Sequence, residues 1–326
     1  MTGRISLGAA ISAALSGVMI AGVAQSAPPE QPPAWAFPVN PPHHSSGGAK
    51  PDAIEHVPGS SAAYTDKQLD DEFFVADWFP KEHGPAPDVV LHGHKPNVAA
   101  CGYCHLPTGT GGPAEAALPG LPASYIIEQV MEMRAGRRHA AQPSMMSVKG
   151  MEEVAHKVDM ADLQAAAQYF SHETFVSHFH VVEADVVPKT AVLAVSLYGV
   201  VSGGGSEALG QRIVEVPADM KQWELGNPHS DFTAYVPKGS IARGKVLVAS
   251  GDGETPCATC HGADLKGSPI APPLAGRSPS YLARQLFDIQ YRTRRGPAVA
   301  PMVPEVARMT AADRIAIVAY LGSLKP

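Results

Sequence analysis

Residues 257–261 have the sequence Cys-Ala-Thr-Cys-His, and residues 101–105 have the sequence Cys-Gly-Tyr-Cys-His. In the pattern C-x-x-C-H, the two thiols can form thioether bonds to the vinyl groups of a haem, and the next histidine can bind its iron. The chain has four cysteines, and these two motifs contain all of them. The sequence therefore predicts two covalently bound haem c groups. The predicted attachment residues are Cys101, Cys104, His105, Cys257, Cys260 and His261.

A C-x-x-C pair can also bind zinc or act as a redox-active dithiol. Cys101 and Cys257 are 156 positions apart, so a zinc site would have to join two distant segments. Such a site would leave the histidine of each motif unexplained. A dithiol likewise gives no reason for a histidine after the second cysteine in both copies. Haem attachment is therefore the preferred interpretation.

The chain contains an internal repeat built around the two motifs. An offset of 156 positions aligns the motifs and the segments that follow them, and an offset of 151 aligns the last part of each copy. Agreement over two separate segments indicates a duplicated domain. The aligned pairs are Leu118 with Leu274, Gly120 with Gly276, Tyr125 with Tyr281, Gln129 with Gln285, Arg138 with Arg294, Met151 with Met302, Asp162 with Asp313 and Tyr169 with Tyr320.

Each copy predicts the same order of elements. A loop rich in glycine and proline follows the motif, and a helix then begins near Ser124 or Ser280, where serine is a favourable N-cap. A loop bearing a methionine comes next. A closing helix ends the copy, most clearly from Thr310 to Leu324, with Thr310 as its cap.

A low-spin haem iron needs a second axial ligand opposite the histidine. Met302 and Met151 occupy matching positions in the two copies, and a thioether ligand favours reduced iron. The predicted axial ligands are therefore His105, Met151, His261 and Met302. Other methionines more often fill a core. The competing ligands are Met309 at the second haem, and Met145, Met146, His92 or His94 at the first.

The N-terminus has the features of a secretory signal peptide. Residues 1–26 contain Arg4, an apolar stretch from Leu7 to Val23, and small residues before Ala27. An uncleaved N-terminal anchor is the alternative, although the stretch is short for a membrane span. Export agrees with haem attachment, which takes place outside the bacterial cytoplasm. We therefore expect a periplasmic protein.

Composition excludes some classes of partner. The net charge is −6, from 25 basic and 31 acidic side chains, whereas nucleic-acid binding would require a basic face. The 31 prolines and 31 glycines predict long irregular connections. No arrangement of hydroxyl, thiol and carboxylate groups suggests bond-making catalysis.

These features resemble the class I cytochromes c, and the tandem arrangement is similar to the periplasmic dihaem cytochromes called cytochrome c-four. The resemblance rests on C-x-x-C-H, residues 272–276 (Pro-Pro-Leu-Ala-Gly), Met302 and the closing helix. It implies a mainly α fold with two class I cytochrome c domains. It also implies that Gly244, in a helix before the second motif, packs on Tyr320, and that the Pro272 carbonyl orients His261.

The sequence and the resemblance together predict five segments. They are a signal peptide (1–26), an irregular N-terminal extension (27–95), cytochrome c domain 1 (96–180), a linker or insertion with short strands (181–237) and cytochrome c domain 2 (238–326). The first copy has Ala116 where the second has Pro272, and it lacks a clear helix before its motif. We therefore expect the extension to pack the first haem, with a helix over 64–79 capped by Thr65. Residues 203–205 (Gly-Gly-Gly) predict a turn, an anion cradle being the alternative.

The predicted function is electron transfer and not catalysis, because an iron with two axial ligands has no open position for a substrate. We expect a carrier between a dehydrogenase or respiratory complex and an acceptor such as an oxidase, reaching a membrane only through a partner. One alternative is a cytochrome subunit of a dehydrogenase. Another is a dihaem peroxidase or thiosulfate dehydrogenase with an open first haem. A thiolate ligand is excluded because every cysteine is used.

Overall fold

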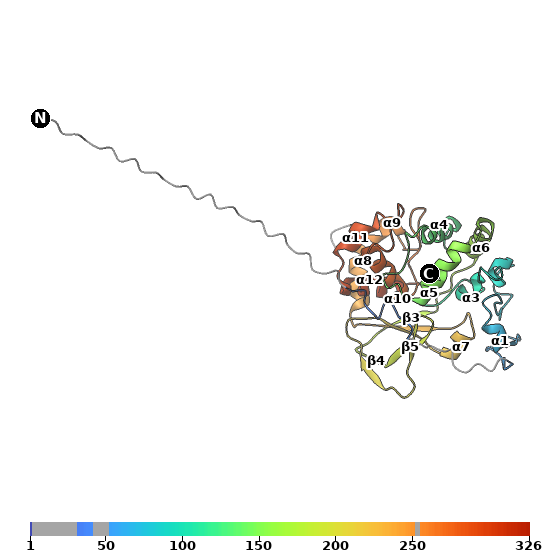
Figure 1. The fold of residues 1–326 in the computed structure, drawn as a ribbon. Helices are drawn as coiled ribbons and strands as arrows, with labels where there is room; N and C mark the ends of the chain where they lie inside the picture. The colour runs from blue at the N-terminus through green and yellow to red at the C-terminus, as the bar shows by residue number, and fades with distance from the viewer. Residues whose placement is uncertain (2–30, 42–51, 252–254) are drawn as a thin grey trace. The chain divides into compact units, whose positions relative to one another are not determined.

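A computed structural model describes Met1 and residues 31–41, 52–251 and 255–326 of the chain (Figure 1). Apart from Met1, the predicted signal peptide lies outside the described residues. Residues 32–326 form a unit of their own.

The two repeats contain helices in the predicted order. Those of the first are α3 (Cys101–His105), α4 (Ala123–Arg134), α5 (Met146–Lys157) and α6 (Met160–His172). Those of the second are α8 (Ser240–Ser250), α9 (Cys257–His261), α10 (Pro279–Gln290), α11 (Met302–Arg308) and α12 (Ala311–Ser323). The described strands lie in the N-terminal extension and the insertion. This distribution agrees with the predicted class.

Helices α8 and α12 pack closely because of one glycine. A Cβ atom at Gly244 would lie 1.9 Å from the Ala316 carbonyl oxygen and 2.8 Å from Cβ of Tyr320. The predicted contact between Gly244 and Tyr320 is therefore confirmed. The cap of α12 is confirmed as well, because Thr310 and Asp313 bond each other's backbone N–H groups in a capping box.

Helices α4 and α10 begin beside Ser124 and Ser280 as predicted, but the predicted serine caps and the predicted methionine loops are wrong. Ser280 lies inside α10, and the side chain of Ser278 caps that helix by accepting a hydrogen bond from the Tyr281 N–H. Ser124 similarly lies inside α4, which begins after Pro122 without a side-chain cap. The predicted methionine loops are helical, since Met302 begins α11 and Met151 lies within α5.

The first repeat is supported by the N-terminal extension. This extension contains β1 (Ile54–Glu55), which pairs antiparallel with β2 (Tyr64–Thr65), then α1 (Asp66–Leu69) and α2 (Asp88–Leu91). Val89 and Val90 of α2 pack into the apolar cluster that contains Phe170 of α6 and Cys101. The extension therefore packs on the first repeat beside Cys101, and its packing on the first haem stays a prediction.

The predicted helix over 64–79 is much shorter than expected. Thr65 does cap it, in a capping box with Gln68, but the helix ends at Leu69. The segment that follows is anchored through its backbone instead, since Ala100 donates to the Glu72 carbonyl at 2.8 Å and Val75 to the Leu91 carbonyl at 3.0 Å.

The earlier part of the extension packs on the second repeat. The rings of Trp35 and Phe37 lie 6.0 Å and 6.4 Å from that of Phe287 in α10. Arg284 of the same helix donates to the Ala36 carbonyl at 3.2 Å. The extension therefore contacts both repeats.

The insertion contributes strands and one short helix. The strands are β3 (Phe179–Glu183), β4 (Val186–Pro188), β5 (Thr190–Ala194), β6 (Leu197–Val200), β7 (Ser206–Ala208), β8 (Val214–Pro217) and β9 (Phe232–Val236), and the helix is α7 (Met220–Glu224). The largest sheet has the order β3-β9-β8, with β3 parallel and β8 antiparallel to β9. Two antiparallel pairs, β4 with β7 and β5 with β6, complete the insertion. Gly203 and Gly205 have positive φ angles between β6 and β7, which confirms the predicted turn.

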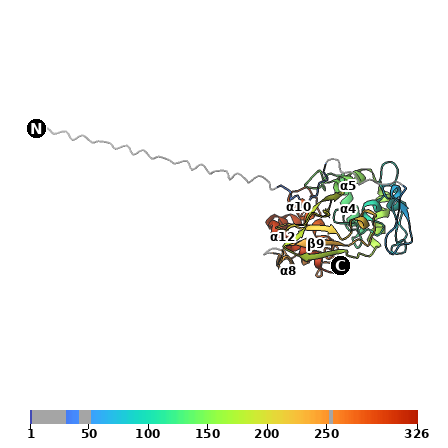
Figure 2. The same ribbon diagram turned by 90° about the horizontal axis from the view of Figure 1, so that it is seen from below.

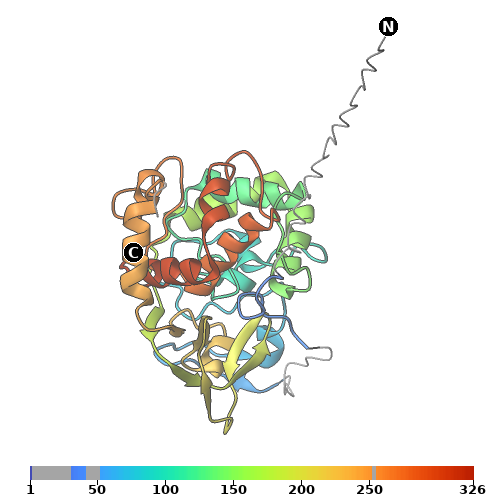
Figure 3. The same ribbon diagram turned by 90° about the vertical axis from the view of Figure 1, so that its left-hand side faces the viewer.

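The three-stranded sheet packs against the second repeat. Figure 2 shows β9 beside α12, and Figure 3 shows the yellow strands beneath the red helices. Val236 joins the core cluster that contains Phe287 and Ile315. Glu215 of β8 accepts hydrogen bonds from the Ser278 hydroxyl and the Ser280 N–H, at 2.9 Å and 2.8 Å. The insertion thus helps to hold α10 in place.

Candidate functional site

Both C-x-x-C-H motifs fold as the same short helix. Residues 101–105 form α3 and residues 257–261 form α9, and each begins after an extended residue. The chain then turns through a positive φ angle, at Leu106 and at Gly262. Positions i and i+3 of a helix lie on one face, so the two thiols of each motif point to the same side. This is the arrangement that two thioether bonds to one ring require.

A backbone carbonyl orients each motif histidine. Nδ1 of His261 lies 2.8 Å from the Pro272 carbonyl oxygen, and Nδ1 of His105 lies 3.0 Å from the Ala116 carbonyl oxygen. The Nδ1–H group donates in both cases, which leaves the Nε2 lone pair free for a metal ion. The predicted role of Pro272 is confirmed, and Ala116 has the same role because the acceptor is a main-chain group.

Burial keeps both histidines neutral. Loss of solvent lowers the pKa of His105 to about 4 and also lowers the pKa of His261. An imidazole must be neutral to bind iron, so this environment favours the ligand form. Burial also raises the pKa of the Cys101 thiol to about 12.

A cavity of about 420 Å³ opens beside the second motif. Its volume lies within the range of roughly 300–1,000 Å³ that is typical of cofactor sites. Cys257, Cys260, His261 and Met302 line it, and α10 and α12 supply part of its apolar walls. Thiols, imidazole, thioether and apolar walls together fit a haem group. The apolar lining includes Leu282, Leu286, Ile289, Ile317, Val318 and Leu321.

The same walls have counterparts in the first repeat. Offsets of 156 and 151 place Ile126, Val130, Met133, Ala166, Ala167 and Phe170 at the positions of those six residues. All six are buried, in two neighbouring apolar clusters of the first repeat. The repeat therefore extends from the motif to the surroundings that a haem would contact.

The candidate axial methionines differ in their surroundings. Met302 and Met309 both line the cavity of the second repeat. The counterpart of Met302 is Met151, which is half-buried beside Val130, whereas the counterpart of Met309 is Val158. Of the two candidate positions, only that of Met302 has a methionine in both repeats, because its counterpart is Met151.

The competing ligands of the first repeat have other partners or positions. Met145 is completely buried in the core shared with α10 and α12, and Met146 is 49% exposed. Nε2 of His94 lies 2.7 Å from the Asp162 carboxylate. His92 is the C-cap residue of α2.

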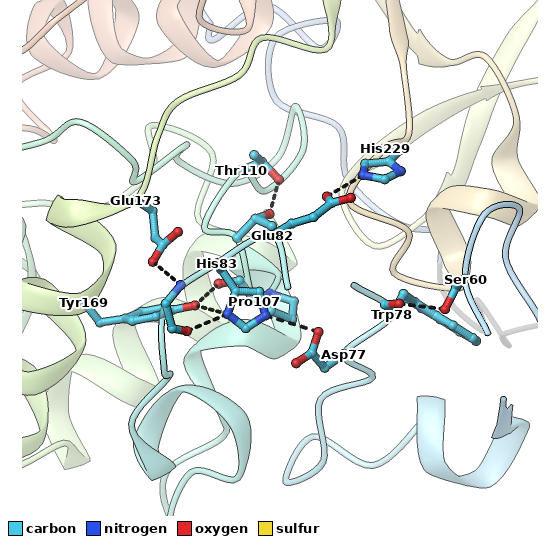
Figure 4. A network of polar contacts seen from close by, with 12 residues as sticks. Ser60, Asp77, Trp78, Glu82, His83, Pro107, Thr110, Tyr169, Glu173 and His229 are labelled. Carbon is cyan, nitrogen blue, oxygen red and sulfur yellow. Dashed lines mark hydrogen bonds and ion pairs between the residues drawn. The ribbon is translucent and has the colours of Figure 1, made fainter. Parts of the chain in front are cut away.

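A polar network joins the extension to the loop after the first motif (Figure 4). His83 lies 3.2 Å from the Asp77 carboxylate and 2.9 Å from the Tyr169 hydroxyl, which donates to the Pro107 carbonyl at 2.7 Å. Gly84 donates to the Glu173 carboxylate at 3.0 Å. Sequence analysis missed this network, because its members are far apart in the sequence and belong to no motif.

A second cluster missed at the sequence level joins the two repeats. Arg138 and Arg294 form an antiparallel backbone bridge, and each side chain reaches a tyrosine of the other repeat. The alignment of the two repeats had already paired Arg138 with Arg294 as equivalent positions. It did not predict that the two residues are in contact.

Comparison with known proteins identifies part of the chain. Residues 241–325 match the family described as Cytochrome c, and these residues include α9 through α12. The second repeat is therefore a cytochrome c domain. This class of domain implies covalently bound haem c. No curated protein matches the chain.

Solved structures show partial likeness. A thiosulfate dehydrogenase from Marichromatium purpuratum, in its as-isolated form, has 24% identity and a TM-score of 0.46, covering 72% of this chain and 38% of its own. This chain thus spans well under half of that protein. Cytochrome c4 of Acidithiobacillus ferrooxidans has 21% identity and a TM-score of 0.44, covering 69% and 98%. Cytochrome c4 of Pseudomonas stutzeri has 20% identity and a TM-score of 0.44, covering 69% and 93%. At these values the likenesses do not indicate an activity or partner.

In the part of the chain that the structure describes, no three His, Cys, Asp or Glu side chains are grouped to hold a metal ion, whereas structural zinc takes four ligands. Within residues 31–41, 52–251 and 255–326, every helix is too short or too polar to cross a bilayer.

Proposed function

We propose that this protein is a periplasmic dihaem c-type cytochrome that carries single electrons between a dehydrogenase or respiratory complex and an acceptor. One observation carries the proposal. Two C-x-x-C-H helices, in two copies of one repeat, each have the histidine Nδ1 bound to a carbonyl at the equivalent position. A chance cysteine pair would not reproduce this orientation twice.

The proposed roles follow from the geometry. Cys101 and Cys104 would hold one haem and Cys257 and Cys260 the other, with His105 and His261 as proximal iron ligands. Met302 and Met151 are proposed as the opposite ligands, because their position is the one at which both repeats supply a thioether. When bound, haem c supplies one-electron redox chemistry at its iron.

The protein itself would bind, orient and shield the haem. The carbonyls of Pro272 and Ala116 keep each imidazole in one orientation. Apolar side chains of α10 and α12 exclude water from the second site, and those of α4 and α6 surround the first motif. Exclusion of water favours reduced iron, which carries less charge.

A redox titration with optical and magnetic spectra tests these roles. Met302→Ala and Met151→Ala should each remove the methionine-ligated signal of one haem and lower its midpoint potential. Met309→Ala and Met146→Ala are matched controls and should retain both signals. Loss of the signal in Met309→Ala, with retention in Met302→Ala, would show that the ligand assignment is wrong.

The same protein distinguishes carriage from the alternatives. Two six-coordinate irons should not bind carbon monoxide when reduced, unless denaturant is added. Binding at the first haem would instead support a dihaem enzyme with an open iron. Stable co-purification with a dehydrogenase would indicate a permanent subunit in place of a free carrier.

A further inference from the structure

His83 of the N-terminal extension is enclosed where the extension meets the first repeat (Figure 4). Its side chain is only 4% exposed. Nδ1 of the ring lies 2.8 Å from the Gly84 carbonyl oxygen and 2.9 Å from the Tyr169 hydroxyl oxygen, and Nε2 lies 3.2 Å from the Asp77 carboxylate. Both ring nitrogens therefore have polar partners inside the protein.

The hydrogen-bond pattern identifies His83 as an imidazolium cation. A carbonyl and a carboxylate have no hydrogen to donate, so they can only accept from the ring. The Tyr169 hydroxyl gives its own hydrogen to the Pro107 carbonyl at 2.7 Å, and it too can only accept from His83. A ring nitrogen that faces acceptors must carry a hydrogen, and here both nitrogens face them. The ring therefore holds two protons and a positive charge.

Titratable groups of two segments face this cation. Asp77 belongs to the extension, Tyr169 to α6, and Glu173 directly follows α6. The hydrogen bond that His83 donates to Asp77 raises the pKa of His83 above 6.5, burial partly opposes the rise, and the Glu173 charge adds to it. Burial raises the pKa of Tyr169, so its hydroxyl stays neutral. The second proton of His83 is therefore lost as the pH rises above 6.5.

The cation is close to the first haem motif through a row of packed rings. The His83 ring centroid lies 6.2 Å from that of Tyr169, which lies 5.1 Å from that of Phe170. The Phe170 ring lies 6.3 Å from the ring of His105, the predicted proximal ligand. The row is buried apart from its half-buried end at His105, so water screens the charge of His83 only weakly along it.

The second repeat is built differently at the equivalent position. Tyr320 is the counterpart of Tyr169, and it packs against Gly244 of α8. The extension supplies His83 in the first repeat, where α2 takes the place of such a helix. An effect of His83 should therefore distinguish the first haem from the second.

We propose that electron uptake at the first haem is coupled to the second proton of His83. This inference rests on the proposed function, because it requires a redox-active haem at residues 101–105. His83 should hold that proton more tightly once the iron has gained an electron, since one positive charge fewer then repels the imidazolium. On oxidation the electron passes to the redox partner. The proton can then leave from Nε2 to the Asp77 carboxylate, which is 20% exposed and leads to water.

The coupling fixes the direction of the pH effect. Protonated His83 disfavours the more positive, oxidised iron, so the potential of the first haem should fall as the ring loses its charge above pH 6.5. Thermodynamic linkage makes the change in the reduction equilibrium equal to the change in proton affinity. We expect about a threefold to tenfold change, and tenfold corresponds to about 59 mV for one electron.

The test is a redox titration of the full-length haem-loaded protein across roughly pH 5 to 9. Proton contacts with Phe170 in magnetic resonance spectra identify the first haem. Its potential should fall with pH in the wild type and stay at the high-pH value throughout in His83→Gln. Asp77→Asn should move the fall to lower pH, because the hydrogen bond that raises the pKa of His83 is weakened.

A matched control comes from the same region. His172→Gln removes an exposed histidine at the end of α6, the helix that contains Tyr169, and should leave the fall unchanged. The second haem should respond to neither substitution. If His83→Gln fails to fold, the wild type supplies the test, because the pKa of His83 should be higher in reduced than in oxidised protein. Equal values in the two states would overturn the inference.

The remaining outcomes separate this inference from the proposed function. A fall that persists in His83→Gln would assign the proton to another group and refute the coupling. A first-haem potential that does not vary with pH in the wild type would also refute it, while leaving electron carriage intact. A protein without haem at Cys101 and Cys104 would instead contradict the proposed function itself.

Discussion

The second repeat has its own N-terminal helix, whereas the first repeat uses the N-terminal extension in its place. In the second repeat, α8 packs on α12 through Gly244 and Tyr320. In the first repeat, α2 packs on α6, and Tyr169, the counterpart of Tyr320, donates a hydrogen bond to Pro107. The equivalent tyrosines therefore have different roles.

The motif geometry is nevertheless the same in both repeats. The histidine Nδ1 lies 2.8 Å from a carbonyl oxygen in one repeat and 3.0 Å in the other. The local loop that follows each motif is thus sufficient to orient the imidazole. The outer support can be exchanged without changing that orientation.

The largest effect is expected from a substitution that disrupts the contact between α8 and α12 in the second repeat. Gly244→Ala places a Cβ atom against the Ala316 carbonyl, so α8 and α12 must separate. We expect a loss of about 3 kcal/mol in unfolding free energy, the upper end for overpacking. Gly150→Ala in α5 is the control, because no atom lies within 4 Å of its added Cβ. It should gain about 0.5–1 kcal/mol. Equal effects in denaturant unfolding would contradict the close contact.

Substitution of the equivalent tyrosines, Tyr169 and Tyr320, should affect the stability of the protein to different extents. Tyr169→Phe leaves the buried Pro107 carbonyl without its donor and should cost about 1–2 kcal/mol. Tyr320→Phe keeps the ring and Cβ that pack against α8, so it should change stability by less than about 0.5 kcal/mol. Thermal unfolding of both variants measures the difference. A larger loss in Tyr320→Phe would reverse the assigned roles.

The support of the first repeat should respond to pH. The hydrogen bond that His83 donates to the Asp77 carboxylate raises the pKa of His83 above 6.5, partly opposed by burial, and Glu173 adds to the rise. Protonated His83 therefore stabilises the fold fully below pH 6.5, and this contribution is lost as the pH rises through the folded-state pKa. The unfolding free energy of His83→Gln should change less with pH over that interval than that of the wild type. The two slopes should differ by the equivalent of less than one bound proton. An unchanged slope would exclude His83 as the titrating group.

A further small effect concerns the residue whose carbonyl orients each motif histidine, which is Pro272 in the second repeat and Ala116 in the first. Pro272→Ala keeps the carbonyl that orients His261, as Ala116 does for His105. We expect a loss of about 0.4–1 kcal/mol from greater freedom of the unfolded chain, with an unchanged spectrum. A changed ligand spectrum in this variant would mean that proline itself, and not the carbonyl, positions the ring.

Local patterns made much of the second repeat predictable. The capping box at Thr310, the close contact at Gly244 and the carbonyl of Pro272 each follow from residues near one another in sequence or from the family resemblance. Pairing of Arg138 with Arg294 was visible as a repeat, but their contact depends on how the repeats dock. Docking depends on long-range packing that leaves no periodic signal.

The extension was predictable only in outline. Thr65 and Gln68 specify a helix start, but the helix ends at Leu69. The network of Asp77, His83 and Tyr169 joins side chains that are up to 92 positions apart in sequence. Such contacts form because the extension covers a surface that lacks its own helix. Their partners become evident once the fold is known.

Mass spectrometry of peptides from exported protein tests the central claim most directly. If each repeat binds one haem, the peptide with residues 101–105 and the peptide with residues 257–261 should both carry the mass of one covalently attached group. Free thiols, or a disulfide, in either motif of the exported protein would contradict that claim.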